Sequence, residues 1–458
     1  MKYYVYIIVF LSILTHFLFW GYPKQVVFDE VHFGYFATEY MSGEYFFDIH
    51  PPLGKMMISA IGSIGNINPE ATFTKINDSF GDNGYMWLRF LPNLAGLLLP
   101  IVIFFLCLRL GFSKMAAFFA GLFIILENSL LVQSRFILLD SFLLLFGFSG
   151  LLFYLLSRKQ LNLRRKIFLL LPAVIFLTFA FSVKWTGLAF LGIVGIIEFI
   201  DFLKNYKKWQ IRDYFYRFIF FVFVPFLIYF SIFLIHFSLL KESGKGDAFM
   251  SPSFQKTLIN SSYETNRDIK PSNTWSKFIE LNKKMFTYNQ TLTASHPYSS
   301  KYYSWPFLYR PIYYWNNSSG DTNNEARIYF IGNPLIYWLS FGAIIFLFFT
   351  ILIRKLGYQG NKKMYLFLFG CFILNFLPYI FIPRVMFLYH YLPSLIFSIL
   401  ALVFIIDKTT VVKNKIRIFI FLTVIFVASF IIMSPLTYGF PLKEHNPYQA
   451  KWWPQIWR

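Results

Sequence analysis

The sequence predicts an all-α protein that crosses a membrane many times. Of its 458 residues, 57% are hydrophobic and only 14% are charged, and the mean hydropathy is +0.53. Soluble domains carry about 25% charged residues, so this composition disfavours a water-soluble enzyme. Phenylalanine alone contributes 61 residues, too many for a single buried core. Since about 20 apolar residues span a bilayer, the apolar content predicts about eleven transmembrane helices.

Eleven apolar segments follow one another along the chain. They are residues 4–20, 88–108, 115–133, 136–156, 167–183, 185–203, 218–240, 330–353, 364–382, 385–406 and 416–434. The first could be a cleaved signal peptide, but the sequence Trp20-Gly21-Tyr22-Pro23 lacks the small residues of a cleavage site. We therefore expect a retained helix and interpret residues 1–458 as one integral-membrane domain.

The distribution of basic residues predicts the orientation of the chain in the membrane. If the N-terminus is cytoplasmic, the inside loops hold about twenty Lys and Arg residues, five of them within 157–166. Basic residues concentrate in cytoplasmic loops. Two long polar stretches, 21–87 and 241–329, and the tail 435–458 then face the non-cytoplasmic side, and the protein is expected in the cell membrane.

Several functions are disfavoured by what the sequence contains. The net charge of +20 could suggest nucleic acid, but the basic residues are accounted for as orientation signals next to anionic lipid. Gly244-Lys245-Gly246 is the nearest approach to a phosphate loop and lacks the rest of that motif. No Cys/His spacing suggests a structural zinc site, and Cys107 and Cys371 lie in apolar segments. These observations disfavour nucleotide-driven chemistry and a disulfide framework.

Three cations stand where the orientation rule predicts none. Arg135, Lys184 and Arg384 each lie where an apolar segment meets the outer surface. A single such residue could extend its charge to the lipid headgroups. Ionisable residues at this depth are nevertheless a functional-site hypothesis by default, and three together are better explained by a shared anion. A phosphate group at the membrane boundary fits.

The first outer stretch contains acids and a rigid turn. Asp29 and Glu30 are adjacent and follow closely on the first apolar segment. Two neighbouring acids are often an ordinary solvated loop. His50 precedes Pro51 and Pro52, and because proline restricts its own backbone and that of the preceding residue, this is a rigid turn. Together they indicate an ordered loop that holds acids outside the membrane.

These segments resemble the protein O-mannosyltransferase family of GT-C membrane glycosyltransferases, which use a polyprenyl-phosphate sugar as donor. The resemblance lies in six ordered blocks: FDEVHFGYFATEYMSGEYFFDIHPPLGK at 28–55, SRFILLDSFLLLF at 134–146, SVKWTGL at 182–188, SHPYSSKYYSWPFLYRPIYYW at 295–315, GNPLIYWL at 332–339 and IPRVMFLYHYLP at 382–393. It implies a GT-C fold with eleven transmembrane helices. Eukaryotic members carry a β-trefoil (MIR) insertion, for which the stretch 241–329 is too short, so the chain looks like a bacterial member.

The resemblance also implies roles for particular residues. Asp29 matches the catalytic base, and Glu30 the acid beside it that orients the acceptor or the loop. Five residues match segments that hold the donor phosphate: Arg135, Lys184, Arg384, His390 and Tyr391. The turn residues His50, Pro51 and Pro52 are expected to shape the loop. His296 and Trp305 fall on the acceptor side, although His296 could be purely structural, and Trp305, Trp452 and Trp453 fit an aromatic belt at the interface.

The function implied is transfer of mannose from a polyprenyl-phosphate donor to Ser or Thr hydroxyls of proteins, by an inverting displacement with Asp29 as base. The partners would be this donor, acceptor proteins and the bilayer. No cofactor is predicted, and a divalent metal beside Asp29 and Glu30 is left open. One alternative is an aminoarabinose-transferase-like enzyme that moves another sugar to a lipid or glycan. A secondary transporter should show half-repeats and interrupted helices, and we find neither in the sequence.

Overall fold

The computed structural model describes residues 1–65, 67, 73–208, 210–292, 295–317, 325–353 and 361–442. Its chain divides into two compact units, each assembled from separate stretches of sequence. Unit 1 comprises Met1–Phe28, Asn93–Phe136 and Ser295–Arg458, and unit 2 comprises Asp29–Pro92 and Ile137–Ala294. Helix α4 (Tyr85–Arg109) begins in unit 2 and ends in unit 1.

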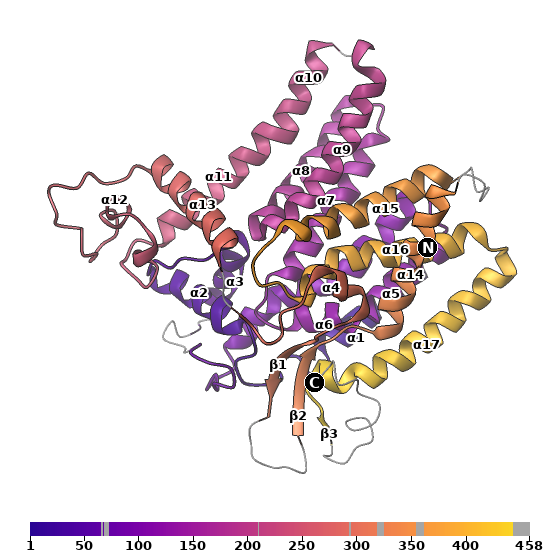
Figure 1. Cartoon of the computed structure of the whole chain (residues 1–458), viewed down its shortest axis with the longest axis horizontal. Coiled ribbons are helices and arrows are strands. Elements are labelled where there is room, and N and C mark those ends of the chain that lie inside the picture. The colour runs from indigo at the N-terminus through magenta and orange to yellow at the C-terminus, as the bar shows by residue number, and fades with distance from the viewer. Residues whose placement is uncertain are drawn as a thin grey trace. The chain divides into compact units, whose positions relative to one another are not determined.

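Unit 2 is built on a bundle of apolar helices. Its helices are α2 (Glu30–Ser42), α3 (Leu53–Ile64), α7 (Asp140–Arg158), α8 (Leu163–Val183), η1 (Trp185–Gly187), α9 (Leu188–Asn205), η2 (Tyr206–Lys208), α10 (Ile211–Phe218), the π-helical turn η3 (Ile219–Phe223), α11 (Val224–Leu239), η4 (Asp247–Phe249), α12 (Pro252–Gln255) and α13 (Thr274–Thr291). Helices α7, α8 and α9 run side by side (Figure 1), and α2 packs on α3.

Unit 1 is centred on a buried helix. Its elements are α1 (Lys2–Phe17), α5 (Lys114–Ile125), α6 (Asn128–Arg135), η5 (Tyr302–Phe307), β1 (Ile312–Asn316), β2 (Glu325–Phe330), α14 (Pro334–Leu352), α15 (Lys362–Phe376), η7 (Leu377–Phe381), η8 (Leu388–Tyr391), α16 (Leu392–Thr409), α17 (Val412–Tyr438) and β3 (Pro441–Leu442). Helices α14, α15 and α5 pack around α16, which explains why α16 is apolar on all sides.

The local sequence explains where many helices begin. Side chains of Ser113, Asn162, Asn273 and Asn333 accept hydrogen bonds from the first backbone amides of α5, α8, α13 and α14, respectively. Ser and Asn are preferred at this position because their short side chains satisfy amides that the helix leaves unpaired. The boundaries of these spans therefore follow from single polar residues next to apolar runs.

The expected all-α membrane architecture is confirmed, although the eleven predicted spans differ in detail. Among the described residues, nine helices are long and apolar enough to cross a membrane, or ten if the bent pair α5 and α6 is one span. That pair is bent by 57°, because Glu127 leaves the helical conformation to cap α6. Helix α1 has only 16 residues, since the chain turns extended at Leu18.

A small antiparallel sheet was not predicted. The strand order is β1-β2-β3, with Ile312 opposite Phe330 and a register shift between Tyr313 and Trp315. Its strands are rich in aromatic and β-branched residues, which favour strands, but they are too short for their alternation to stand out. Strands β1 and β2 lie in unit 1, before and after residues 318–324, which are outside the described part of the chain.

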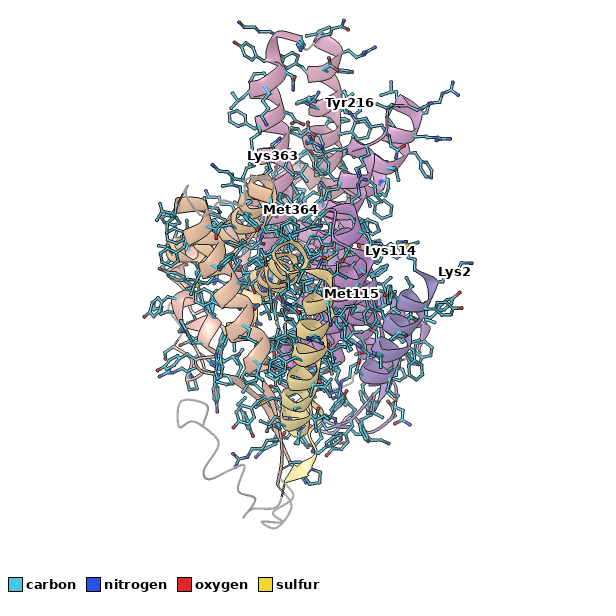
Figure 2. The ribbon with its side chains drawn as sticks, turned by 90° about the vertical axis from the view of Figure 1, so that its right-hand side faces the viewer. Lys2, Lys114, Met115, Tyr216, Lys363 and Met364 are labelled. Atoms are coloured by element: carbon cyan, nitrogen blue, oxygen red, sulfur yellow. The ribbon has the colours of Figure 1, made fainter. Side chains whose placement is uncertain are left out.

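Three exposed lysines of unit 1 lie at the first turns of helices. Lys2, Lys114 and Lys363 lie in the first turns of α1, α5 and α15, and all three are exposed. Figure 2 shows them toward the end of unit 1 away from the β-strands. Exposed basic residues favour the cytoplasmic side, and the orientation of the chain in the membrane stays a prediction.

Candidate active site

Asp29 stands immediately before helix α2. Its backbone carbonyl accepts hydrogen bonds of 2.9 Å from the amides of His32 and Phe33 and so starts the helix. The Asp29 carboxylate does not cap the helix in the described structure. It is therefore not committed to the role that Asp usually fills at this position.

The residue before Asp29 has an unusual backbone conformation. Phe28 has a φ of +44°, in the left-handed region that a bulky side chain rarely adopts. Its amide donates to the Tyr314 carbonyl at 3.1 Å, and its ring stacks on the Tyr314 ring with centroids 4.3 Å apart. The Tyr314 hydroxyl in turn donates to Gln133 at 2.6 Å. Strain of this kind persists where neighbours over-determine it, and here the contacts of Phe28 with Tyr314 hold it.

The electrostatic surroundings of Asp29 favour a role as a base. Burial raises the pKa of Asp29 to about 6, while the charges of His32 and Lys184 lower it and those of Asp140 and Asp48 raise it further. A carboxylate that titrates near neutrality is ionised at pH 7 and yet basic enough to take a proton in a transition state. All the groups that act on Asp29 here belong to unit 2.

Glu30 has a different task from its neighbour. Its carboxylate accepts two hydrogen bonds of 2.7 Å from Arg89 and one of 3.0 Å from the amide of Ile137. The side chains of Glu30 and Arg89 have no exposed area, and the Arg89 guanidinium also lies over the rings of Phe80 and Tyr85. Glu30 is expected from the sequence to orient either the acceptor or the loop; these contacts join it to the loop and to Arg89, and its role in the reaction stays a prediction.

Arg89 was not identified from the sequence as a site residue, because it lies within the apolar segment 88–108. A lone arginine in such a segment is itself a signal, because an ionisable residue at membrane depth requires a partner. Asp140 was missed for the same reason. The signal was present in both cases, but nothing in the sequence says which acid pairs with which base.

Lys184 is paired with Asp140. Its ammonium group lies 2.9 Å from both carboxylate oxygens of Asp140, and the two side chains are 8% and 7% exposed. Lys184 stands between α8 and η1, where the chain is extended, and Asp140 begins α7. A donor phosphate would therefore share this ammonium group with an acid already in place.

The His-Pro-Pro turn is organised around a buried lysine. Lys55 is 1% exposed; its ammonium pairs with Asp48 and donates to the His50 carbonyl at 2.7 Å. Pro52 immediately precedes helix α3, and the His50 ring packs on Phe33. Since His50 contributes its backbone oxygen to this arrangement, the contacts support the predicted loop-shaping role of His50, Pro51 and Pro52.

Arg135 belongs to unit 1 and contacts backbone carbonyls. Its guanidinium donates to Thr437 at 3.0 Å, to Phe19 at 2.9 Å and to Tyr22 at 3.4 Å, and it lies over the ring of Tyr438. It is 2% exposed. These contacts join α6 to the end of α1 and to the end of α17, so Arg135 stabilises the packing of unit 1. Its role in binding phosphate stays a prediction.

The remaining predicted donor residues also lie in unit 1. Arg384 is half-buried between η7 and η8. Nδ1 of His390 lies 2.9 Å from the Phe387 carbonyl, and the His390 ring stacks on Trp305. Tyr391 is fully buried against Tyr337. The structure thus places Arg135, Arg384, His390 and Tyr391 in one unit, and Asp29 and Lys184 in the other.

The two predicted acceptor-side residues differ in exposure. His296 is half-buried and packs edge-on against Phe387 with ring centroids 5.0 Å apart. Trp305 has no exposed area and donates from its indole to Ser300 at 3.0 Å. The interpretation of Trp305 as an interface anchor is therefore wrong, because its ring fills the interior of unit 1. Trp452 and Trp453 lie outside the described residues.

The described residues contain no cluster of metal ligands. Among them, no group of three or more His, Cys, Asp or Glu side chains is placed to hold a metal ion. The charged groups that act on Asp29 are instead His32, Lys184, Asp140 and Asp48, and Lys184 is paired with Asp140.

Solved structures with this fold are membrane glycosyltransferases. The chain is similar over its whole length to a subunit of the Saccharomyces cerevisiae protein O-mannosyltransferase Pmt1–Pmt2 complex bound to the sugar donor, with a TM-score of 0.89, 22% identity and 92% of that chain covered. A less similar structure is ArnT from Cupriavidus metallidurans bound to undecaprenyl phosphate, with a TM-score of 0.55, 14% identity and coverage of 95% of this chain and 65% of that one. The chain therefore has a GT-C fold and is a multi-pass membrane protein.

The chain belongs to the dolichyl-phosphate-mannose-protein mannosyltransferase family. That family's model matches residues 6–241, and a model of the C-terminal four-helix region of protein O-mannosyltransferases matches residues 274–457. Protein O-mannosyltransferase 1 of Drosophila melanogaster is 33% identical over 52% of this chain, and a Candida albicans dolichyl-phosphate-mannose–protein mannosyltransferase is 35% identical over 56% of it. The matched regions cover only 28% and 35% of those relatives.

Proposed function

We propose that this chain transfers mannose from a polyprenyl-phosphate-mannose donor to Ser or Thr hydroxyls of proteins on the non-cytoplasmic side of the cell membrane. Family membership supports the reaction class. The observation that carries the proposal is the Asp29 carboxylate, which is not used to cap α2 and whose pKa is raised to about 6 by burial. A hydroxyl acceptor has no charge of its own and needs such a base.

The proposed reaction is a single displacement. The acceptor hydroxyl oxygen attacks the anomeric carbon, and its proton passes to the Asp29 carboxylate. The bond between that carbon and the phosphate oxygen breaks, and the phosphate leaves with the bonding electrons. It leaves already ionised, so no general acid is required, and a fixed cation stabilises its growing charge. One displacement inverts the anomeric centre, so a β-linked donor yields an α-linked product.

Lys184 is the first choice for the cation that faces the phosphate, because it belongs to the same unit as Asp29 and its charge acts on that carboxylate. The other donor-side residues suggested by the sequence are Arg135, Arg384, His390 and Tyr391, and of these Arg135 has contacts that favour a structural role. The N-terminus would be cytoplasmic and the two long stretches outside. The absence of a β-trefoil domain stays a prediction.

The proposal is tested with purified protein, labelled polyprenyl-phosphate mannose and a Ser/Thr peptide. Transfer by the wild type and its loss in Asp29→Asn are expected. The matched control is Asp82→Asn, because Asp82 is an exposed acid of the same outer stretch whose contact with the amide of Gly84 an asparagine can keep. Transfer of a different sugar, or transfer to a lipid or glycan and not to the peptide, would overturn the proposal in favour of an ArnT-like activity.

A further inference from the structure

Residues Ser243–Asp247 form a tight turn at the start of the second outer stretch. The Asp247 carboxylate accepts from the Ser243 hydroxyl at 2.5 Å and from the Gly244 amide at 3.1 Å, and the Asp247 amide donates back to the Gly244 carbonyl at 3.1 Å. Turns of this kind are stabilised by a side chain that bonds nearby backbone amides. The turn contains Gly244-Lys245-Gly246, which resembles a phosphate loop only in part.

This turn is joined to the first outer stretch by backbone hydrogen bonds. The amides of Lys241 and Glu242 donate to the Gly43 carbonyl at 3.0 Å each. The Tyr45 amide donates to the Glu242 carbonyl at 2.9 Å, and the Gly246 amide to the Tyr45 carbonyl at 3.0 Å. The two stretches thus satisfy each other's backbone groups, as neighbouring strands do.

Only glycine fits at the two positions where the backbones approach most closely. A Cβ atom added to Gly244 would lie 2.4 Å from the Tyr45 carbonyl oxygen. One added to Gly246 would lie 2.4 Å from the carbonyl carbon of Phe46 and 2.5 Å from the amide nitrogen of Phe47. Because these neighbours are backbone atoms, a side chain could be accommodated only if the two stretches moved apart.

The segment held in this way leads directly to the charged groups beside Asp29. The Phe46 ring lies below the ammonium group of Lys55, which pairs with Asp48 and with the His50 carbonyl. Asp48 in turn acts electrostatically on Asp29. Any displacement of residues 45–47 would therefore move Asp48 relative to Asp29.

We propose that Gly244 and Gly246 are positioning residues: they let the second outer stretch clamp residues 43–46, and the clamp holds Lys55 and its partner Asp48, whose charge acts on Asp29. The catalytic part of this inference rests on the proposed function; the clamp itself does not. Neither glycine would touch the donor or the acceptor.

The test compares Gly244→Ala and Gly246→Ala with Gly195→Ala. Gly195 lies in α9 of the same unit, and a Cβ atom there would meet nothing within 4 Å. The first readout is the rate at which an amine-reactive reagent labels Lys55 in the folded protein, relative to the exposed Lys75. A local opening should raise the labelling of Lys55 at least about tenfold in the two clamp variants, and Gly195→Ala should leave it unchanged.

The second readout is the pH profile of mannosyl transfer. His32, Lys184, Asp140 and Asp48 all act on Asp29, and burial is the largest effect on its pKa. Since both burial and Asp48 raise that pKa, loosening the clamp should move the acid limb of the profile to lower pH, a change that a uniform loss of stability would not cause. If either alanine variant fails to fold, Asp247→Ala, which removes the bonds of the turn without a clash, should give the same two changes.

Unchanged labelling of Lys55 in folded variants would overturn the clamp. If labelling of Lys55 increased but the acid limb of the pH profile did not move, the proposed link between the clamp and Asp29 would be overturned. Because labelling requires no turnover, it decides the clamp even if the wild type transfers no mannose, and the two proposals can therefore fail separately.

Discussion

Arg89 holds Glu30 through two parallel hydrogen bonds of 2.7 Å, from Nε to Oε1 and from Nη2 to Oε2, and both side chains are completely buried. Such a planar, bidentate contact is specific to arginine. The two adjacent acids of the first outer stretch are thus separated in function. Glu30 is committed to Arg89, which leaves Asp29 as the acid able to react.

Replacing Arg89 by alanine should lower the stability of the folded protein far more than replacing an exposed arginine. Removing one partner of a buried pair leaves an uncompensated charge and costs about 3–5 kcal/mol. We expect Arg89→Ala to lower the unfolding temperature strongly in detergent. The control is Arg158→Ala, since the Arg158–Asp201 pair is about a third exposed and such pairs contribute about 0–1 kcal/mol. Equal effects of the two substitutions would contradict the assignment of Glu30 and Arg89 as a structural pair.

Asp29→Asn should abolish transfer while donor binding stays nearly intact. General-base catalysis contributes about 10²–10⁴-fold, so turnover should fall by at least about a hundredfold. In the wild type, the raised pKa of about 6 predicts that transfer is constant above pH 7 and falls tenfold for each pH unit well below pH 6. A variant that retains more than about a tenth of wild-type turnover would be incompatible with a base worth that factor.

The same substitution should make the protein slightly more stable, in a pH-dependent way. The pKa of Asp29 is about 6 in the folded protein and has an ordinary value of 3.8. Well below pH 3.8 the group is protonated in both states and contributes nothing. As the pH rises through 4–6 only the unfolded state ionises readily, so stability is lost. Asp29→Asn should therefore unfold only slightly higher than the wild type at pH 4 and about 1–3 °C higher at pH 7, as measured by thermal scans. A larger difference at pH 4 than at pH 7 would contradict the raised pKa.

The parts of the fold that follow from composition could be predicted from the sequence. Every predicted apolar segment contains a helix of the structure, because burial in lipid requires long apolar runs whatever their packing. The break at Glu127 and the early end of α1 at Phe17 depend on single residues that cap or leave a helix. Hydropathy averages over such residues and cannot detect them.

Single residues of the candidate site could be predicted from the sequence, but the ion pairs that they form could not. Asp29, Glu30 and Lys184 were singled out from the sequence, whereas their partners Arg89 and Asp140 were not. A pairing between residues far apart in the chain depends on how helices pack. The same holds for the contact of Gly244 with Tyr45, which no local pattern indicates.

Arg135→Ala should mainly lower stability. Its guanidinium donates to the carbonyls of Thr437, Phe19 and Tyr22, and a hydrogen bond from a charged group contributes about 1.5–3 kcal/mol. Arg135→Lys should recover only part of the loss, because an ammonium group cannot reach several carbonyls in the fixed geometry of a guanidinium. A fall in donor affinity with unchanged stability would instead support the phosphate role predicted from the sequence.

Lys184→Ala should weaken donor binding and also destabilise the protein, and a second substitution can separate the two effects. A charge-assisted contact to the donor phosphate contributes about 1.5–3 kcal/mol, or about 10- to 150-fold in the dissociation constant. Stability falls for a different reason, because the variant leaves the 7% exposed Asp140 carboxylate without its lysine. Lys184→Ala combined with Asp140→Asn also removes the charge of Asp140 and should restore much of the stability, but it should not restore donor binding. Donor affinity and unfolding temperature are measured for both variants in the same detergent, with Asp140→Asn alone as the control that keeps the lysine. If the double variant regained donor affinity together with stability, Lys184 would act only through Asp140, and the proposed contact with the phosphate would have to be abandoned.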